Sequence, residues 1–208
     1  MKTSFKIFDF AGAPVNISLW FFLLFLFVPF SYVIAIFISV LIHELAHAYV
    51  ANSKGWQVYE IRVDLFTGSA AVDTNIPERD SIPVVAAGPL SNLALAVLSI
   101  LLYAIFGQTS PMFGDFINDF FIVNIFMFVF NILPIYPMDG GRLLKDFLFL
   151  KMRSNRALAR KIAGGVSLVF ATALLAYSIS ISAIIMAIFS LLFIYAALVE
   201  LGFIKSST

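Results

Sequence analysis

The sequence predicts a polytopic α-helical membrane protein, with six transmembrane helices and a short membrane-associated β-hairpin between the second and third helices. Composition is the first reason: 62% of the 208 residues are hydrophobic and only 12% are charged, which excludes a water-soluble globule with an ordinary polar surface. The distribution of charge is the second reason. With six spans, all 13 Lys and Arg residues fall on one side of the bilayer, and the connections on the other side carry none. The positive-inside bias makes that side the cytoplasm.

The N-terminal part of the chain alternates between turn-forming and apolar residues. Residues 5–18 contain Asp9, Gly12 and Pro14 among apolar residues, which favours a short strand as a lead-in to the first span. Six apolar segments are predicted as transmembrane helices, of which the first is short for a span and needs the lead-in to complete it. They cover about residues 17–29, 32–52, 82–106, 116–132, 162–177 and 181–203. Pro29 predicts the reversal after the first helix, and Gly55 the end of the second.

Residues 56–80 differ in character from the apolar segments. Val58, Glu60 and Arg62 lie in an alternating run, which a turn and a second short run from Gly68 follow. This pattern predicts a β-hairpin. The alternative is a solvated loop that covers the membrane surface. The charge distribution places this hairpin, both termini and the basic stretch 142–161 in the cytoplasm.

The second predicted helix contains the run His43-Glu44-Leu45-Ala46-His47, which includes both histidines of the chain. Residues at i and i+4 lie on one face of a helix, one turn apart. Two imidazole ligands plus a carboxylate that takes a proton from water form the zincin arrangement. The alternative is a pair of buried, hydrogen-bonded polar residues in a packed helix. Ionisable groups at membrane depth are costly and usually functional, which favours a metal site.

A catalytic zinc needs a third protein ligand, and the absence of cysteine restricts it to a carboxylate. Asp139 is the favoured candidate, because Pro134 and Pro137 interrupt the fourth helix just before it and two glycines follow it. An aspartate on non-helical backbone at membrane depth must be buried in protein or line a wet cavity. Two alternatives stay open: Asp139 caps the next helix, or Glu200 in the last helix is the ligand.

Three motifs in this order resemble the site-2 protease family of intramembrane zinc metalloproteases. They are His43-Glu44-Leu45-Ala46-His47, Gly88-Pro89-Leu90-Ser91-Asn92 and Asn131-x-x-Pro134-x-x-Pro137-x-Asp139-Gly140. The resemblance covers nearly the whole chain, and it implies Zn2+ held by His43, His47 and Asp139 with Glu44 as general base. It also implies a single transmembrane protease core over residues 1–208, without the PDZ or nucleotide-sensing domains that some members carry.

The remaining candidate residues concern the substrate. Asn131 offers an amide to the substrate backbone or the developing oxyanion, although a helix–helix hydrogen bond is an equal alternative; Asn92 is a weaker candidate for the same role. A helical substrate must unwind before its carbonyl can be attacked. The hairpin edge around Gly68 and Ala70 is expected to pair with the unwound segment as an added strand.

We therefore expect a zinc-dependent metalloendopeptidase in the bilayer. Its partner is a single-span membrane protein, cut within or near the cytoplasmic end of its transmembrane helix, and no nucleic acid is involved. The alternative from another class is a membrane protein that stores or transports zinc, although no inverted repeat is visible. Another enzyme class, a membrane-anchored zincin facing water, would take Glu200 as third ligand. The sequence indicates no oligomeric state.

Overall fold

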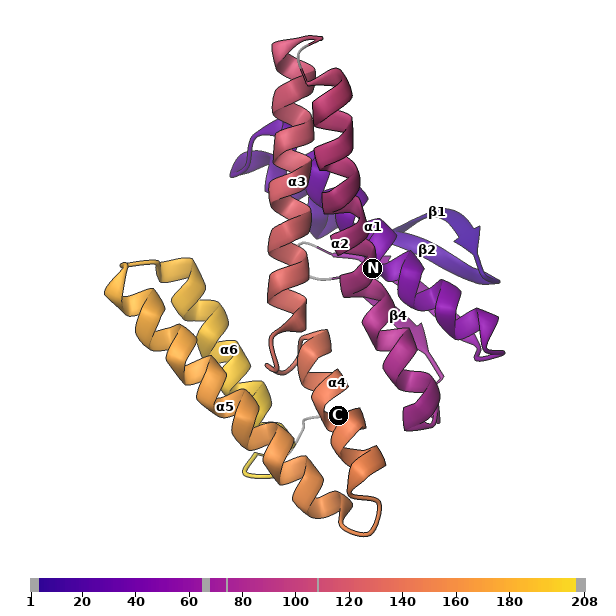
Figure 1. The fold of residues 1–208 in the computed structure, drawn as a ribbon, viewed down its shortest axis with the longest axis vertical. Coiled ribbons are helices and arrows are strands. Elements are labelled where there is room, and N and C mark those ends of the chain that lie inside the picture. Colours follow the sequence, from indigo (N-terminus) through magenta and orange to yellow (C-terminus); the bar gives the residue numbers. More distant parts are fainter. Residues whose placement is uncertain (1–3, 65–67, 74, 108, 205–208) are drawn as a thin grey trace. The chain divides into compact units, whose positions relative to one another are not determined.

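The computed structural model describes residues 4–64, 68–73, 75–107 and 109–204 (Figure 1). The chain divides into two compact units, Met1–Val129 and Phe130–Thr208. The first unit holds a four-stranded sheet, one 3-10 helix, two complete α-helices and most of a third, and the second holds the remaining described helices. The elements are β1 (Ser4–Phe10), β2 (Ala13–Ser18), the 3-10 helix η1 (Leu19–Leu26), α1 (Phe30–Ser53), β3 (Val58–Val63), β4 (Gly68–Val72), α2 (Glu78–Phe106), α3 (Pro111–Ile132), α4 (Asp139–Lys151), α5 (Arg156–Ser180) and α6 (Ile184–Glu200).

The four strands form one mixed sheet in the order β1-β2-β3-β4. β3 and β4 pair antiparallel, which confirms the predicted hairpin. The lead-in differs from the prediction, because it forms a hairpin of two strands rather than one short strand. Its turn places both Ala11 and Gly12 at positive φ, 52° and 78°, a two-residue geometry that suits the twist of a hairpin. Alanine is not a typical turn residue, so the sequence did not predict this turn.

A parallel pairing of β2 with β3 joins the two hairpins. Asn16 donates a hydrogen bond to Glu60 across this pair at 2.7 Å, and Arg62 lies 2.9 Å from the same carboxylate. Partial burial raises the pKa of Glu60, but hydrogen bonds from Arg62 and Asn16 outweigh burial and hold the pKa below its ordinary value. The two hairpins are thus tied by polar contacts as well as by the backbone ladder.

The sheet packs on the C-terminal half of α1. Val15 and Ile61 of the sheet are fully buried against Ala48 and Ala51 of the helix. The small alanine side chains let the sheet approach the helix closely. This packing fixes the turns of α1 that carry the paired histidines.

The predicted first helix over residues 17–29 is corrected by the structure. Ile17 belongs to β2, where it pairs with Val63, and Ser18 accepts a hydrogen bond from the Trp20 N–H at 3.3 Å. Only the eight residues of η1 then remain as helix, because the sheet ladder takes the start of the apolar run. Among the described residues, four helices are long and apolar enough to cross a membrane: α1, α2, α3 and α5. α6, with 17 residues, is a shorter apolar helix.

The second unit is built around the pairing of α5 with α6, drawn in orange and yellow (Figure 1). Ala171 and Phe193 are buried together with Ile135, which precedes α4. The basic stretch 142–161 splits into the end of α4 and the start of α5. Asn155 caps α5 by accepting a hydrogen bond from the Leu158 N–H at 3.0 Å. The fifth helix therefore begins at Arg156, six residues before the predicted start.

Candidate metal centre

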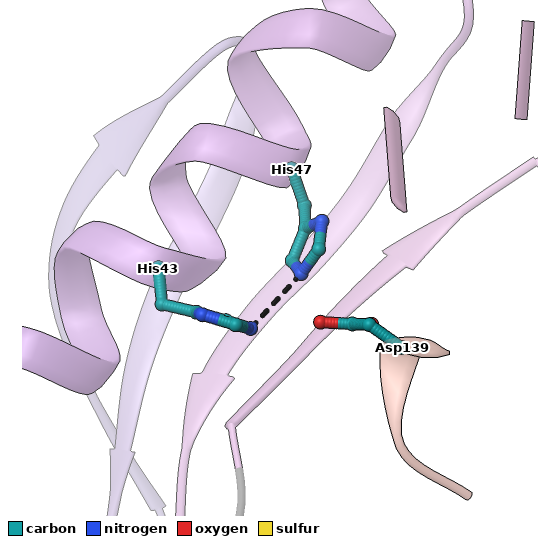
Figure 2. Close-up of side chains that lie close together, drawn as sticks. All are labelled: His43, His47 and Asp139. Atoms are coloured by element: carbon teal, nitrogen blue, oxygen red, sulfur yellow. Dashed lines mark hydrogen bonds between the residues drawn. The ribbon is translucent and has the colours of Figure 1, made fainter. Parts of the chain in front are cut away.

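The two histidines lie on successive turns of α1, and both are buried, with 4% of His43 and 8% of His47 exposed. Their Nε2 atoms are 3.1 Å apart, joined by the dashed line in Figure 2. The rings meet edge-on, with centroids 4.7 Å apart. The i, i+4 spacing thus places both imidazoles on one face, as predicted from the sequence.

The other nitrogen of each ring has an oxygen partner. His47 Nδ1 lies 2.8 Å from the Val84 carbonyl oxygen, which only accepts hydrogen bonds, so Nδ1 carries the proton. His43 Nδ1 lies 2.6 Å from Asn92 Oδ1, also an acceptor. With both Nδ1 atoms donating, the neutral form of each imidazole keeps the lone pair of Nε2 for a metal.

Two imidazole nitrogens at this separation fit a bound cation. Tetrahedral zinc with Zn–N bonds of 2.0–2.1 Å brings two ligand nitrogens to roughly 3.3 Å of each other, close to the observed 3.1 Å. Gly88 of α2 leaves room for the two imidazoles, since a Cβ at this position would overlap both rings. The chemistry of the two nitrogen donors fits a zinc ion.

Glu44 lies between the two histidines in sequence and is also buried, with 6% of the residue exposed. Its side chain contacts the first residue of β4, because a Cβ at Gly68 would overlap the Glu44 carboxylate. β4 is the terminal strand of the sheet. The candidate general base therefore lies directly beside the start of an edge strand.

Asp139 is the first residue of α4 and is 93% buried, with 7% exposed; Figure 2 labels it together with His43 and His47. The two glycines after it allow α4 to begin against the backbone that precedes it. A Cβ at Gly140 would overlap the carbonyl oxygens of Ile132 and Leu133 at the end of α3. The turn is held further by the Tyr136 N–H, which donates to Ser167 Oγ of α5 at 2.8 Å.

The other predicted site residues lie in different surroundings. Asn131 is half-buried in the last turn of α3, and Ala70 is half-buried in the middle of β4, opposite Ile61. Asn92 is fully buried, and both ends of its amide are engaged: Oδ1 faces His43, and Nδ2 donates to Asn124 Oδ1 at 2.9 Å. Glu200 lies 3.4 Å from Lys145 and 3.5 Å from Arg160, so its carboxylate serves an ion-pair network.

Sequence reasoning missed three contributors to this site. Val84 contributes through its backbone carbonyl, which no sequence pattern reports. Ser39 and Asn124 are both fully buried polar residues in apolar helices. A single asparagine in the run 120–130, which is otherwise entirely apolar, was the available signal for a buried hydrogen-bond partner.

Comparisons with known proteins agree with this geometry. The family model of peptidase family M50 matches residues 31–113 and 108–177 of this chain. A zinc metalloprotease of Methanocaldococcus jannaschii is 28% identical over 213 residues, which cover 94% of this chain and 59% of that protein. Stage IV sporulation protein FB of Bacillus subtilis is 31% identical over 113 residues, covering 53% of this chain and 38% of that protein. The chain thus spans less than two thirds of the length of either relative.

A solved structure is similar over almost the full chain. The site-2 protease from Methanocaldococcus jannaschii aligns with a TM-score of 0.70 at 25% sequence identity. The alignment covers 99% of this chain and 98% of that one.

Proposed function

The chain belongs to peptidase family M50, the family that its similarity to a site-2 protease also indicates, and from this we propose that it is an intramembrane zinc metalloprotease. It hydrolyses a peptide bond within or near the cytoplasmic end of a substrate transmembrane helix. The observation that carries the proposal is the pair of buried imidazoles whose Nε2 atoms lie 3.1 Å apart, beside a buried glutamate.

Asp139 is the proposed third ligand. Zinc in a catalytic site takes three protein ligands, and a set of two histidines and one carboxylate meets that need. The chain contains no cysteine and only two histidines, so the third ligand must be an oxygen. Asp139 is a buried carboxylate, whereas Glu200 has Lys145 and Arg160 as partners. The chemistry of the donors thus favours Asp139.

Glu44 is the proposed general base and acid. When bound, zinc supplies Lewis acidity that polarises a peptide carbonyl and makes a water molecule easier to deprotonate. The Glu44 carboxylate takes the proton of the attacking water and then passes it to the nitrogen of the leaving amine. Asn131 is our candidate for holding the substrate backbone or the developing oxyanion, since its side-chain amide is a donor near the turn that leads to Asp139.

The free edge of β4 is the proposed docking place for the unwound substrate. An added strand replaces the backbone hydrogen bonds that the substrate helix loses, each of which costs several kcal/mol in lipid. Gly68 is in contact with Glu44. The carbonyl groups of a substrate strand paired with β4 therefore lie close to the general base. This geometry connects substrate unwinding to the chemistry in one place.

Two proline variants test the strand pairing. Neighbouring residues of a strand point their N–H groups to opposite edges, so Ala70→Pro and Ala71→Pro each remove one N–H, one facing β3 and the other the free edge. The variant that loses the N–H at the free edge is recognised by its unfolding temperature, which should equal that of the parent. We expect this variant to cut a transmembrane substrate more slowly, by more than about tenfold, because one backbone hydrogen bond to the substrate is lost in lipid. Unchanged turnover in that variant would contradict the pairing.

The chain is an integral membrane protein, and we propose that its termini, sheet and zinc site lie towards the cytoplasm. All 13 Lys and Arg residues fall on one side in the predicted topology. The pairing of β2 with β3 supports this, because it holds the N-terminal strands in the same sheet as the hairpin after α1. The position of the cut in the substrate also tests this orientation.

Cleavage of single-span membrane substrates by the purified protein tests the function. We expect zinc-dependent cleavage that a chelator abolishes and added zinc restores, at a site near the cytoplasmic end of the substrate helix, as mapped by mass spectrometry. Helix-weakening residues such as Gly, Pro or Asn near the cut should speed it, because they lower the cost of unwinding. A cut in a soluble part of the substrate would instead indicate a surface-facing protease. Stoichiometric zinc without any cleavage would support the storage or transport alternative.

A further inference from the structure

We infer that Asn124 of α3, supported by Ser39 of α1, is a positioning residue that keeps His43 ready to bind metal through Nε2. It does so by fixing which end of the Asn92 amide faces the His43 ring. The inference rests on the zinc site proposed above and adds a second layer of residues to it.

The observation is a continuous chain of hydrogen bonds through three helices. Asn124 Nδ2 donates to Ser39 Oγ at 2.8 Å and to the Phe120 carbonyl oxygen at 2.8 Å. Asn92 Nδ2 donates to Asn124 Oδ1 at 2.9 Å, and Asn92 Oδ1 lies 2.6 Å from His43 Nδ1. Ser39, Asn92 and Asn124 are each 0% exposed. These side chains therefore make their hydrogen bonds away from bulk solvent.

A backbone carbonyl group decides which atoms donate and which accept in this series of hydrogen bonds. An asparagine side chain has an oxygen and a nitrogen end of nearly the same shape, and only its partners decide which end points where. The Phe120 carbonyl oxygen can only accept, so Asn124 must turn its NH2 group towards it. Asn124 Oδ1 then faces α2 and accepts from Asn92 Nδ2. That leaves Asn92 Oδ1 for His43.

A reversed Asn92 would disable His43 as a ligand. Its NH2 group would then face Nδ1, which would have to accept, and the ring proton would move to Nε2. A protonated Nε2 cannot coordinate a metal. His47 has no such requirement, because its Nδ1 donates to the Val84 carbonyl oxygen directly.

This geometry also assigns a role to Asn92. Both ends of its amide are engaged within the protein, which favours a positioning role over contact with the substrate. Outer partners of metal-bound histidines typically change metal affinity by 10- to 100-fold when they are lost.

Asn124→Leu tests the inference, with Asn118→Leu as the matched control. Both variants make the same change in α3, but Asn118 is exposed. Zinc affinity is measured on the full chain in detergent by competition with a chelator, and the ligand geometry by the absorption spectrum of the Co2+-substituted protein. We expect Asn124→Leu to weaken zinc binding by about 10- to 100-fold and to alter the Co2+ spectrum. Asn118→Leu should leave both unchanged.

A second substitution separates orientation from packing. Asn92→Asp places a carboxylate beside His43, and both of its oxygens accept, so no orientation has to be fixed. In the Asn92→Asp background, Asn124→Leu should not weaken zinc binding. Either carboxylate oxygen accepts from His43 Nδ1, and the leucine removes Asn124 Oδ1, an acceptor that would face the new carboxylate. If Asn124 only joined the helices, Asn124→Leu would weaken zinc binding equally in both backgrounds, and that result would overturn the inference.

The milder variant Ser39→Ala covers the case in which Asn124→Leu does not fold. It removes one hydrogen bond to Asn124 and should weaken zinc binding in the parent but not in the Asn92→Asp background. Equal loss in both backgrounds again contradicts the inference. Failure of the proposed function looks different: the parent protein itself would then bind no stoichiometric zinc, or bind it without His43.

Discussion

Asp139→Asn should release zinc from the protein while α4 stays in place. Met138 is the N-cap of α4 and Asp139 is its first helical residue, so the amide loses only the interaction of a carboxylate with the helix N-terminus, about 0.3–1 kcal/mol. The first turn of α4 is therefore expected to keep its structure. The amide oxygen is uncharged and a far weaker zinc ligand than a carboxylate. We expect zinc affinity to fall more than about 100-fold, beyond the range typical of outer-shell changes. The zinc content of the protein after gel filtration in a buffer that contains a chelator measures this loss.

Two comparisons make this result specific. Glu200→Ala removes the other candidate carboxylate and should leave zinc occupancy unchanged, although it breaks the ion pairs with Lys145 and Arg160. Asp139→Ala should lose zinc as Asp139→Asn does. If Asp139→Asn and Asp139→Ala both keep full zinc, Asp139 is not a ligand; if Glu200→Ala alone loses zinc, the ligand assignment is wrong.

Glu44→Gln should abolish peptide cleavage while the protein stays folded and keeps its zinc. Glutamine has nearly the same shape, so its contact with Gly68 is retained. An amide neither takes a proton from water nor delivers one to the leaving nitrogen. Loss of a general acid–base group costs about 100- to 10,000-fold, and we expect the upper end because one residue serves both steps.

Glu78→Gln is the matched control for this variant. Glu78 lies in the first turn of α2, and the same change of carboxylate to amide there should leave turnover unchanged. Zinc content and the unfolding temperature are measured on both variants. Turnover of Glu44→Gln near that of the parent would remove Glu44 from the mechanism, and loss of its zinc would indicate a ligand instead of a base.

Much of the fold could be predicted because local patterns dominate in a membrane protein. The four long apolar helices and the hairpin of β3 and β4 were all predicted from the sequence. The largest error was the first span, where residues up to Ser18 belong to β2. An apolar run of this kind suits a helix or a buried strand equally well, and only pairing with β3 decides between them.

The sequence by itself determined the chemistry of the site. The i, i+4 spacing of His43 and His47 places both rings on one helix face, and the absence of other histidines and of cysteine limits the third ligand to a carboxylate. These conclusions need only the geometry of one helix and an inventory of side chains, so they follow from the chain alone.

Only the tertiary structure decided how the histidines are held. Asn124 and Ser39 are 85 residues apart in the chain, yet they are hydrogen-bonded to each other, and the partner of His47 is a backbone carbonyl. The proton position on each imidazole depends on these partners. Hydrogen-bond direction is set by atoms that meet only after helices pack, so no spacing along the sequence encodes it.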